Sequence, residues 1–536
     1  MAPVMTDAAQ LKLFNSLTRQ LEVFRPIHEG EARVYSCGPT VYNYPHIGNM
    51  RAYVFADVLG RTLSFKGYKL THVINITDVG HLTDDADTGE DKLEKAAAAN
   101  AQSIWDIAKH YTEAFWADVK ALNIRQPSQW TIATDYVPAM IEFAKSIAEK
   151  HCYEIEGGLY FDVTSVAGYG RLARTSKEAF VAAAEVLFNE GRFEDAEIAA
   201  RKAIGNPSQA RSRVGAVDGK RNAADFAIWR KTPPGETRQM EWDSPWGRGA
   251  PGWHLECSVM SGEVLGFPFD IHTGGIDHRE IHHPCEIAQN QAFCHSDASG
   301  ANIWMHNNFL VERSGKMSKS SGEFLRLQLL EDRGYHPLAY RLMCLQAHYR
   351  SELEFSWEVL EAALVRLKRI LGGMNSIKVK LPRFFTAAMI NPRDAFADVP
   401  LEFSDERMGS MLLGYLKRFD DAISDDLNTA VALTLFEDVI GLKGLDPFQQ
   451  AVAILHMDWV LGIGVRNLIL GDVRIRPKGA KIDEASIQST LQARQLAREQ
   501  RNYVQADGLR ELLKENGVEV MDGSSDLELG WDWKRD

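Results

Sequence analysis

The chain has 536 residues, of which 45% are hydrophobic and 25% charged, a composition typical of a globular protein with several domains. No apolar run is long enough to cross a bilayer and the amino terminus lacks a signal-peptide pattern, so we expect a cytoplasmic protein without membrane contact. The net charge of -13 excludes indiscriminate nucleic-acid binding but allows an RNA recognised by its shape. Six scattered cysteines form no dense disulfide framework and suit a metal or substrate in a reducing compartment.

Residues 1–30 form a lead-in to the first regular pattern. A short buried strand is predicted up to Cys37, a helix over about Ile47–Phe65 and a second strand over Lys69–Ile76. This order is a βαβ unit, which requires a parallel sheet with a right-handed crossover. We therefore predict an α/β fold with a doubly wound, Rossmann-like parallel-sheet domain over residues 31–336.

The segment His46-Ile47-Gly48-Asn49 stands where the first strand turns into the helix. Backbone N–H groups and the positive end of the helix dipole favour an anion there. His46 and Asn49 add side-chain donors at the same place. A lone histidine at such a junction is more often only a helix cap, so this segment gains weight only beside a second phosphate-handling motif.

Between about residues 91 and 221 the pattern turns helical, which predicts a mostly helical insertion in the sheet domain. Residues 176–209 match the spacing of one tetratricopeptide-like hairpin, with Phe180, Leu187 and Pro207 among the matching positions. No second copy follows, and a single unit cannot bury its own apolar face. The hairpin therefore packs on its host domain, the favoured reading, or meets a partner.

Potential metal ligands gather in two later segments. His282 and Glu286 are four residues apart, so they share one face of a helix, and Cys257 follows a Trp253-His254-Leu255-Glu256 run. With Cys37 they make two thiolates, an imidazole and a carboxylate, a set that suits Zn²⁺ better than Mg²⁺ or Ca²⁺. The alternative is that the two cysteines are buried apolar thiols and His282 a satisfied histidine. Cys285, beside Glu286, is an inert neighbour or an alternative ligand, and we favour the first.

The stretch Asp270-Ile271-His272-Thr273-Gly274-Gly275 predicts a later strand that runs into a glycine loop. In doubly wound sheets, ligands bind beyond the carboxyl ends of the strands. His46, Asp78 and Gly274 all follow predicted strands in this way, so we expect them at one edge of the sheet.

A second phosphate-handling motif is Lys316-Met317-Ser318-Lys319-Ser320, which lies among glycines and serines. Its two ammonium groups suit negative charge that develops during a reaction. Helical patterns then dominate residues 337–470, with a break around 372–400 that predicts a linker. A basic Gly/Pro segment leads to a small last unit at residues 482–536.

Together and in this order, the two phosphate motifs resemble the signatures of class I aminoacyl-tRNA synthetases. Three further segments resemble cysteinyl-tRNA synthetase: Cys37-Gly38-Pro39-Thr40-Val41-Tyr42, Gly252-Trp253-His254-Leu255-Glu256-Cys257 and His282-His283-x-x-Glu286-Ile287. The similarity to this family runs from about residue 30 to the C-terminus. Asn49 departs from the family, which usually has a second histidine there. Asparagine keeps a donor but cannot be cationic. The tetratricopeptide-like stretch is not part of the expected pattern.

The resemblance implies ATP-dependent activation of cysteine, with Mg²⁺, and transfer of the cysteinyl group to the 3′ end of tRNA(Cys). It assigns the phosphates to His46, Asn49, Lys316 and Lys319, and Lys319 is the stronger candidate for direct ATP contact. Gly274, Gly275 and Asp277 match the family's ATP-binding glycine loop, in which an acidic residue binds ribose. Thr40, Trp253 and His272 would wall the cysteine pocket.

One zinc ion per chain, held by Cys37, Cys257, His282 and Glu286, is also implied by the resemblance. A substrate thiolate that binds zinc gains a bond that the hard hydroxyl of serine cannot match. Such a bond makes editing unnecessary for discrimination between the two amino acids. The chain is expected to act as a monomer.

The C-terminal unit resembles the family's anticodon-binding domain. Arg498, Tyr503, Asp507 and Asp522 match positions that would read anticodon bases by stacking and edge hydrogen bonds. Arg498 and Asp507 also fit an ordinary charged helix face.

Three rival functions remain open from the residues. A tRNA-independent ligase that joins cysteine to a small amine would not need an RNA-reading tail, whereas about two hundred residues follow Gly322. A non-catalytic RNA-binding protein would have lost catalytic groups, which are present here. Zinc hydrolysis with Glu256 as base ranks last, because four protein ligands and a substrate thiol leave little room for an activated water.

Overall fold

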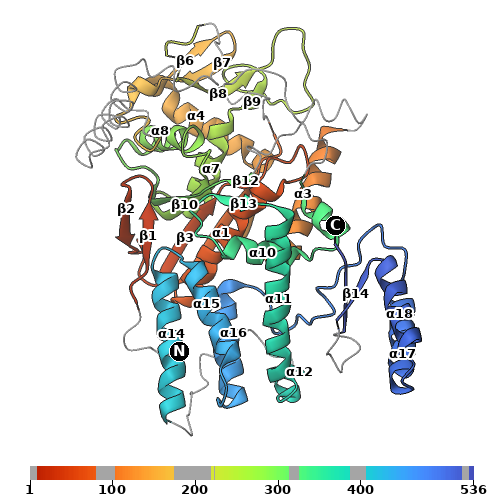
Figure 1. Cartoon of the computed structure of the whole chain (residues 1–536). Coiled ribbons are helices and arrows are strands. Elements are labelled where there is room, and N and C mark those ends of the chain that lie inside the picture. Colours follow the sequence, from red (N-terminus) through yellow and green to blue (C-terminus); the bar gives the residue numbers. More distant parts are fainter. Residues whose placement is uncertain are drawn as a thin grey trace, which may run out of the picture.

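A five-stranded parallel sheet, which includes β3 and β10 in Figure 1, forms the centre of the amino-terminal half. Its strand order is β11–β10–β3–β4–β5. The computed structural model describes residues 9–79, 103–173, 219–222, 224–312, 325–386, 406–521 and 530–535. The strands of the sheet are β3 (Glu31–Ser36), β4 (Lys69–Ile76), β5 (Gln129–Ile132), β10 (Phe269–Gly275) and β11 (Ala301–Asn307). The chain order reverses between β3 and β10, which makes the sheet doubly wound with its switch point there. The predicted fold class is confirmed.

Helix α1 (Ile47–Phe65) has the predicted bounds, as does β4. His46 caps its amino end, and Gly67 with φ +92° ends the turn that follows it, a conformation that favours glycine. Most of its residues are buried, because α1 packs against the sheet and also against α10 (Pro337–Leu345) and α16 (Pro447–Leu461). The helix thus links the sheet to the helical part of the chain.

Further helices carry the candidate ligands against the sheet. They are α3 (Ile104–Ala121), α4 (Val137–His151), α7 (Trp253–Leu265) and α8 (His282–Cys294). Helix α7 contacts β3 and β4 and also packs against α8 and α4. The amino ends of α7 and α8 thereby meet near the carboxyl end of β3, where Cys37 follows the strand.

The described part of the predicted insertion contains the helices α3 and α4 and also short strands that the pattern did not predict. Strand β5 lies within residues 91–221 but belongs to the main sheet, and β6 (Cys152–Ile155) and β7 (Gly158–Phe161) start a second, antiparallel sheet. That sheet continues with β8 (Phe226–Lys231) and β9 (Gly249–Pro251). Strands of four residues are too short to show a period of two against the flanking helices. The tetratricopeptide-like stretch 176–209 lies outside the described residues.

Short strands and turns complete the part of the fold around the parallel sheet. An antiparallel hairpin within the lead-in, β1 (Lys12–Asn15) and β2 (Gln20–Val23), lies beside β11, where Ser16 N donates to Trp304 O at 2.8 Å. Strands β12 (Leu310–Glu312) and β13 (Leu353–Phe355) pair in parallel. The 3₁₀ turns η1 (Ala133–Tyr136) and η2 (Val163–Ser165) flank α4 and the second sheet.

The described residues after Pro337 are mainly helical up to Leu461, as the pattern predicted. Besides α10 and α16 the segment holds α11 (Trp357–Lys378), α12 (Pro382–Thr386), α14 (Glu406–Ser424) and α15 (Thr429–Gly441), preceded by α9 (Leu327–Asp332). These helices lie below the sheet in Figure 1, with α11, α14, α15 and α16 roughly side by side. The break expected around residues 372–400 does not begin at Gly372-Gly373, because α11 continues through both glycines to Lys378 and α12 follows. Residues 387–405 lie outside the described residues.

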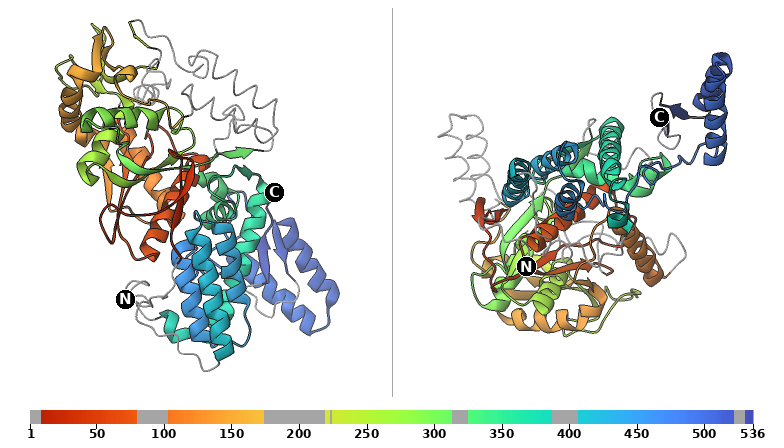
Figure 2. Two further views of the ribbon diagram at one scale, coloured as in Figure 1. Left: turned by 90° about the vertical axis from the view of Figure 1, so that its left-hand side faces the viewer. Right: turned by 90° about the horizontal axis from the view of Figure 1, so that it is seen from below.

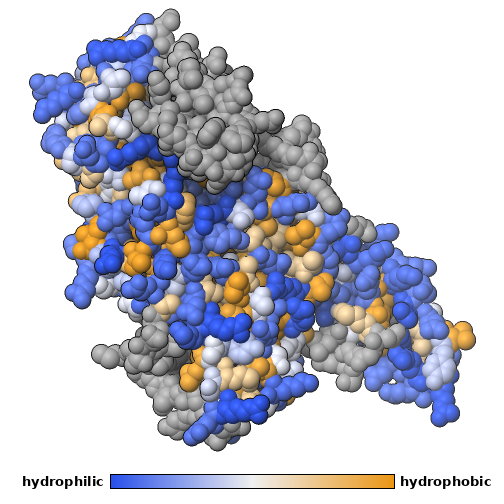
Figure 3. Space-filling view, turned by 60° about the vertical axis from the view of Figure 1, so that its left-hand side comes forward, coloured by the Kyte–Doolittle hydropathy of each residue, from blue (hydrophilic) through white to orange (hydrophobic). Residues whose placement is uncertain are grey.

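A small C-terminal unit stands to one side of these helices (Figure 2). It comprises α17 (Glu484–Glu499), α18 (Tyr503–Glu515), β14 (Val518–Val520) and β15 (Trp531–Trp533). Its buried residues form a hydrophobic core of their own around Trp531 and Trp533. Figure 3 shows this lobe as largely hydrophilic, with isolated hydrophobic side chains on its surface. In the described part of the chain, no helix is both long and apolar enough to cross a membrane.

Candidate active site and metal centre

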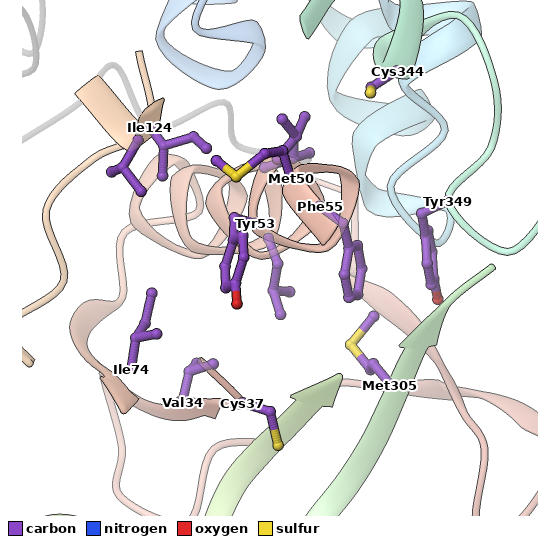
Figure 4. Close-up of a cluster of buried hydrophobic side chains, with 14 of the residues drawn as sticks. Val34, Cys37, Met50, Tyr53, Phe55, Ile74, Ile124, Met305, Cys344 and Tyr349 are labelled. Atoms are coloured by element: carbon purple, nitrogen blue, oxygen red, sulfur yellow. The ribbon is translucent and has the colours of Figure 1, made fainter. Parts of the chain in front are cut away.

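The predicted site residues meet at the switch point of the sheet. Cys37 directly follows β3, Gly274 and Gly275 end β10, and His46 stands at the start of α1. Backbone bonds hold these ends together, since Cys37 N donates to Thr273 O at 3.1 Å. Figure 4 shows Cys37 on the sheet side of α1, beneath Tyr53. The crevice at a switch point is where doubly wound sheets bind their ligands.

The four predicted metal ligands are buried and form one cluster. Ligand atoms of Cys37, Cys257, His282 and Glu286 all lie within 4.8 Å of one another. His282 Nε2 is 3.4 Å from Cys257 Sγ and 3.1 Å from Glu286 Oε1. The helical spacing of four residues brings His282 and Glu286 together in the first turns of α8, as predicted. Two sulfurs, an imidazole and a carboxylate are a donor set suited to zinc.

A second quartet overlaps the first. Cys37 and Glu286 also lie within 4.8 Å of ligand atoms of His272 and His283. The two carboxylate oxygens of Glu286 face different quartets. Oε2 accepts a hydrogen bond from His272 Nε2 of the second quartet at 2.9 Å, whereas Oε1 faces His282 of the first. Within the described chain, the buried Oε1 accepts no hydrogen bond, and His282 Nε2 lies 3.1 Å away as its ion-pair partner. A buried carboxylate oxygen without a hydrogen bond, beside two thiols, is a position that a bound cation would complete.

Histidines behind the cluster orient its ligand side chains, a role that was not predicted from the sequence. His254 Nδ1 is 2.9 Å from His282 Nδ1, and His283 Nε2 is 3.3 Å from Cys37 Sγ. His283 Nδ1 in turn is 2.8 Å from His306 Nε2 on β11. Partners of this kind fix the ring orientation of metal ligands. The signal available in the sequence was the high local density of histidines, since seven of the 16 fall between residues 254 and 306.

The charges of the cluster depend on one another. The pKa of Cys257 is lowered to about 6 by a hydrogen bond from Cys37, with help from His282. Burial lowers the pKa of His282, but the charges of Glu286 and Cys257 outweigh it and raise that pKa to about 10. Burial raises the pKa of Glu286, which His272 and His282 nevertheless bring down to about 2. A thiolate and a carboxylate thus face one buried imidazolium, a net negative charge that favours a cation.

His46 and Asn49 act as a capping box at the start of α1. His46 Nδ1 accepts from Gly48 N at 3.0 Å, and Asn49 Oδ1 accepts from His46 N at 3.2 Å. The Asn49 oxygen is therefore used by the backbone, while its amide N–H₂ group lies on an exposed side chain. The asparagine keeps the helix start ordered in a way that does not need a second histidine.

The glycines at the end of β10 permit close approach. A Cβ on Gly274 would lie 2.7 Å from His283 Cε1, and one on Gly275 would lie 2.3 Å from Asp277 Oδ1. Side chains at these positions would therefore displace His283 or Asp277. The geometry brings Asp277 next to the predicted glycine loop.

Of the predicted pocket residues, Trp253 lies next to the cluster, with its ring 4.4 Å from that of His282. Thr40 bridges to Thr77, whose hydroxyl donates to Glu256 Oε2 at 2.9 Å. His272 is fully buried, hydrogen-bonded to Glu286 and stacked on Trp304 at 4.5 Å. It therefore influences the site through Glu286 instead of lining an open pocket.

Cys285 stands apart from both quartets of the described residues. Its buried sulfur lies 3.4 Å from Tyr169 Oη. This position agrees with an inert neighbour.

The remaining predicted residues lie elsewhere. Arg498, Tyr503 and Asp507 are exposed on α17 and α18, far along the chain from the cluster. Lys316, Lys319 and Asp522 lie outside the described residues.

Comparison with known proteins places this geometry in a family. The profile of "tRNA synthetases class I (C) catalytic domain" matches residues 23–365. The chain is 66% identical over 533 residues to the cysteine–tRNA ligase of Novosphingobium aromaticivorans, spanning 98% of this chain and 97% of that protein. It is 48% identical over 540 residues to the cysteine–tRNA ligase of Zymomonas mobilis, spanning 98% of each. An Agrobacterium radiobacter K84 LeuRS–tRNA–LeuAMS complex superposes with a TM-score of 0.53 at 12% identity, covering 86% of each chain, which supports the fold alone.

Proposed function

The chain belongs to the class I tRNA synthetases of the cysteine type, and we propose that it activates L-cysteine with ATP to cysteinyl-adenylate and transfers it to the 3′ end of tRNA(Cys). The substrates are cysteine, ATP with Mg²⁺, and the tRNA. We expect the reaction to take place in the cytoplasm, on a monomer.

The observation that carries the proposal is the buried cluster of Cys37, Cys257, His282 and Glu286 beside the start of α1. These four residues would hold one zinc ion, with Glu286 Oε1 as its oxygen ligand and His272 steadying Oε2. When bound, zinc supplies a soft acceptor for the substrate thiolate that serine cannot match. Selection of cysteine and activation of its carboxylate then occur at neighbouring strand ends.

The first step is attack of the cysteine carboxylate on the α-phosphate of ATP, with pyrophosphate leaving. His46 and the backbone N–H groups at the start of α1 bind the phosphates. Gly274 and Gly275 admit the nucleotide close to β10, and Asp277 binds the ribose. Lys316 and Lys319 stabilise the charge on the leaving pyrophosphate. Thr40 and Trp253 confine the small side chain of cysteine.

Recognition of the tRNA falls to the C-terminal unit. Arg498 lies in the last turn of α17, Tyr503 begins α18, and Asp507 lies one turn later; all three are exposed. An aromatic ring, a guanidinium and a carboxylate can stack on splayed bases and bond to their edges. Asp522 completes the proposed set.

Two assays on the same preparation test the function. Cysteine-dependent ATP–pyrophosphate exchange reports activation, and charging of tRNA(Cys) with labelled cysteine reports transfer. We expect both, and we expect His46→Ala to reduce exchange strongly while the fold is retained. Exchange without charging would favour a ligase that needs no tRNA, and absence of both would refute the proposal.

A further inference from the structure

A cavity of about 370 Å³ opens at the end of β4 that is opposite to the metal cluster. It lies between the carboxyl-terminal half of α1 and the loop that joins α3 to β5. Polar residues in its lining include Ser64, His72 and Arg125, and apolar residues include Tyr53, Ile74 and Ile124. The exposed residues Gly67, Lys69, Gln126 and Ser128 mark its mouth. This volume is at the lower end of the range for small-molecule sites, about 300–1,000 Å³.

Apolar groups line the inner part of the cavity. Tyr53 projects from α1 toward the sheet, where Ile74 lies on β4, and Ile124 lies nearby (Figure 4). Leu70 adds a further apolar wall nearer the mouth. Such walls favour a ligand with a compact apolar body.

Positive charge exceeds negative charge beside these walls. The buried carboxylate of Asp57 faces three guanidinium groups, with Arg61 Nε and Arg341 Nη2 at 2.7 Å and Arg125 Nε at 3.4 Å. The other nitrogens of Arg61 and Arg341 donate to backbone carbonyl oxygens. Arg125 is the one of the three that lines the cavity.

Two side-chain nitrogens of the cavity lining lie close together beside Gly60 of α1. A Cβ built on Gly60 would lie 2.6 Å from Arg125 Nη2 and 3.6 Å from His72 Nδ1. His72 is 6% exposed, and its Nε2 lies 2.8 Å from Ser36 Oγ. When Nε2 accepts from that hydroxyl, Nδ1 carries the ring proton and is a donor. Within the residues that the structure describes, neither Arg125 Nη2 nor His72 Nδ1 has a hydrogen-bond partner in the protein. Ser64 Oγ lies 3.3 Å from Arg125 Nη1 and borders the same space.

We propose that this cavity binds a small organic anion, a carboxylate on a compact apolar body, with Arg125 and His72 on the carboxylate and Tyr53, Ile74 and Ile124 around the body. The charge of Arg125 and the bidentate reach of its guanidinium suit a carboxylate. Lys69 at the mouth attracts the anion. The mouth of the cavity lies at the other end of β4 from the metal cluster, and the proposal does not depend on the proposed function.

Calorimetric titration of the full-length protein with benzoate tests the proposal. Saturable binding with one site per chain is expected, unchanged by an excess of AMP, which is directed to the nucleotide site. Benzyl alcohol, which lacks the charge, and sulfate, which lacks the apolar body, should each bind at least tenfold more weakly. A water-filled cavity would give no saturable heat with benzoate, which would overturn the proposal, as would equal binding of either comparison compound.

Variants locate the binding. Arg125→Gln should weaken benzoate at least tenfold, and Gly60→Ala should do the same, because its methyl group would lie 2.6 Å from Arg125 Nη2 and displace the guanidinium. The alanine also favours the helix, so Gly60→Ala keeps the test open if Arg125→Gln fails to fold. Lys69→Gln should weaken benzoate about two- to threefold, whereas Lys145→Gln, an exposed lysine that is also paired with a glutamate, should not. Unchanged affinity in Gly60→Ala would contradict the assignment.

Discussion

The two carboxylate oxygens of Glu286 lie in different surroundings. Oε2 receives a hydrogen bond from His272, while Oε1 faces His282 without one. This division assigns one oxygen to the metal and the other to the supporting histidine. The spacing of the ligands could be predicted from sequence because His282 and Glu286 share a helix. The supporting histidines could not, since they come from β10, β11 and α7 and meet only in the folded chain.

Replacement of His272 by alanine should therefore weaken zinc binding by about 10- to 100-fold, a typical effect of losing a partner of a metal ligand. Zinc affinity can be measured by competition with a chromogenic chelator. His28→Ala, an exposed histidine in the lead-in, is the matched control and should leave affinity unchanged. Equal affinity in both variants would show that Glu286 needs no support.

Asn49 combines two roles that one substitution separates. Asn49→Asp keeps the oxygen that accepts from His46 N but loses the amide donors and adds negative charge. We expect thermal stability to change little, since an acidic residue suits a helix start. The rate of ATP–pyrophosphate exchange should fall about tenfold or more, because the phosphates lose a donor and meet a like charge. An unchanged rate would mean that Asn49 only caps the helix.

At the scale of elements, predictions succeeded where local signals were complete. Helix α1 has a cap before it and a glycine after it, and both ends were placed correctly. Strands β5, β6 and β7 were missed, because four residues carry too little pattern and tertiary pairing decides them. The prediction that the helix breaks at the glycine pair of α11 failed for a related reason, because a contact between distant segments decides one of the two positions. Gly373 serves packing, since a Cβ there would lie 2.5 Å from Ile440 Cγ2 on α15.

The two glycines provide a matched pair of substitutions. Gly372→Ala meets nothing within 4 Å and should stabilise the protein by about 0.5–1 kcal/mol through helix propensity. Gly373→Ala should destabilise it, because overpacking costs about 1–3 kcal/mol and outweighs that gain. Urea unfolding followed by circular dichroism measures both. A stabilised Gly373→Ala would show that α11 and α15 separate without cost.

At the scale of the whole molecule, chemistry and RNA recognition occupy different parts. The metal cluster lies at the switch point of the sheet, and the C-terminal unit has its own core to the side of the helices (Figure 2). Ion pairs join the unit to α11, including one between Lys368 and Asp532. The sequence indicated both parts, because each carries local motifs. Their mutual arrangement depends on contacts between distant segments and was not predictable.

Tyr503→Ala should consequently impair one activity and spare the other. Loss of a base-stacking group worth about 1–3 kcal/mol should lower kcat/KM for tRNA charging by about 5- to 150-fold. Cysteine-dependent pyrophosphate exchange should be unchanged, because Tyr503 is 61% exposed and belongs to the separate unit. Lys417→Ala, an exposed change on α14, serves as control. A parallel loss of exchange would contradict the separation of the two parts.

The most direct test of the account is cysteine-dependent ATP–pyrophosphate exchange before and after removal of zinc, with serine as the competing substrate. The zinc-loaded protein should exchange with cysteine and only weakly with serine. Chelation should abolish the cysteine-dependent exchange, and added zinc should restore it. Full exchange with cysteine in the metal-free protein, or equal exchange with serine in the loaded protein, would contradict selection of the substrate thiol by a metal at Cys37, Cys257, His282 and Glu286.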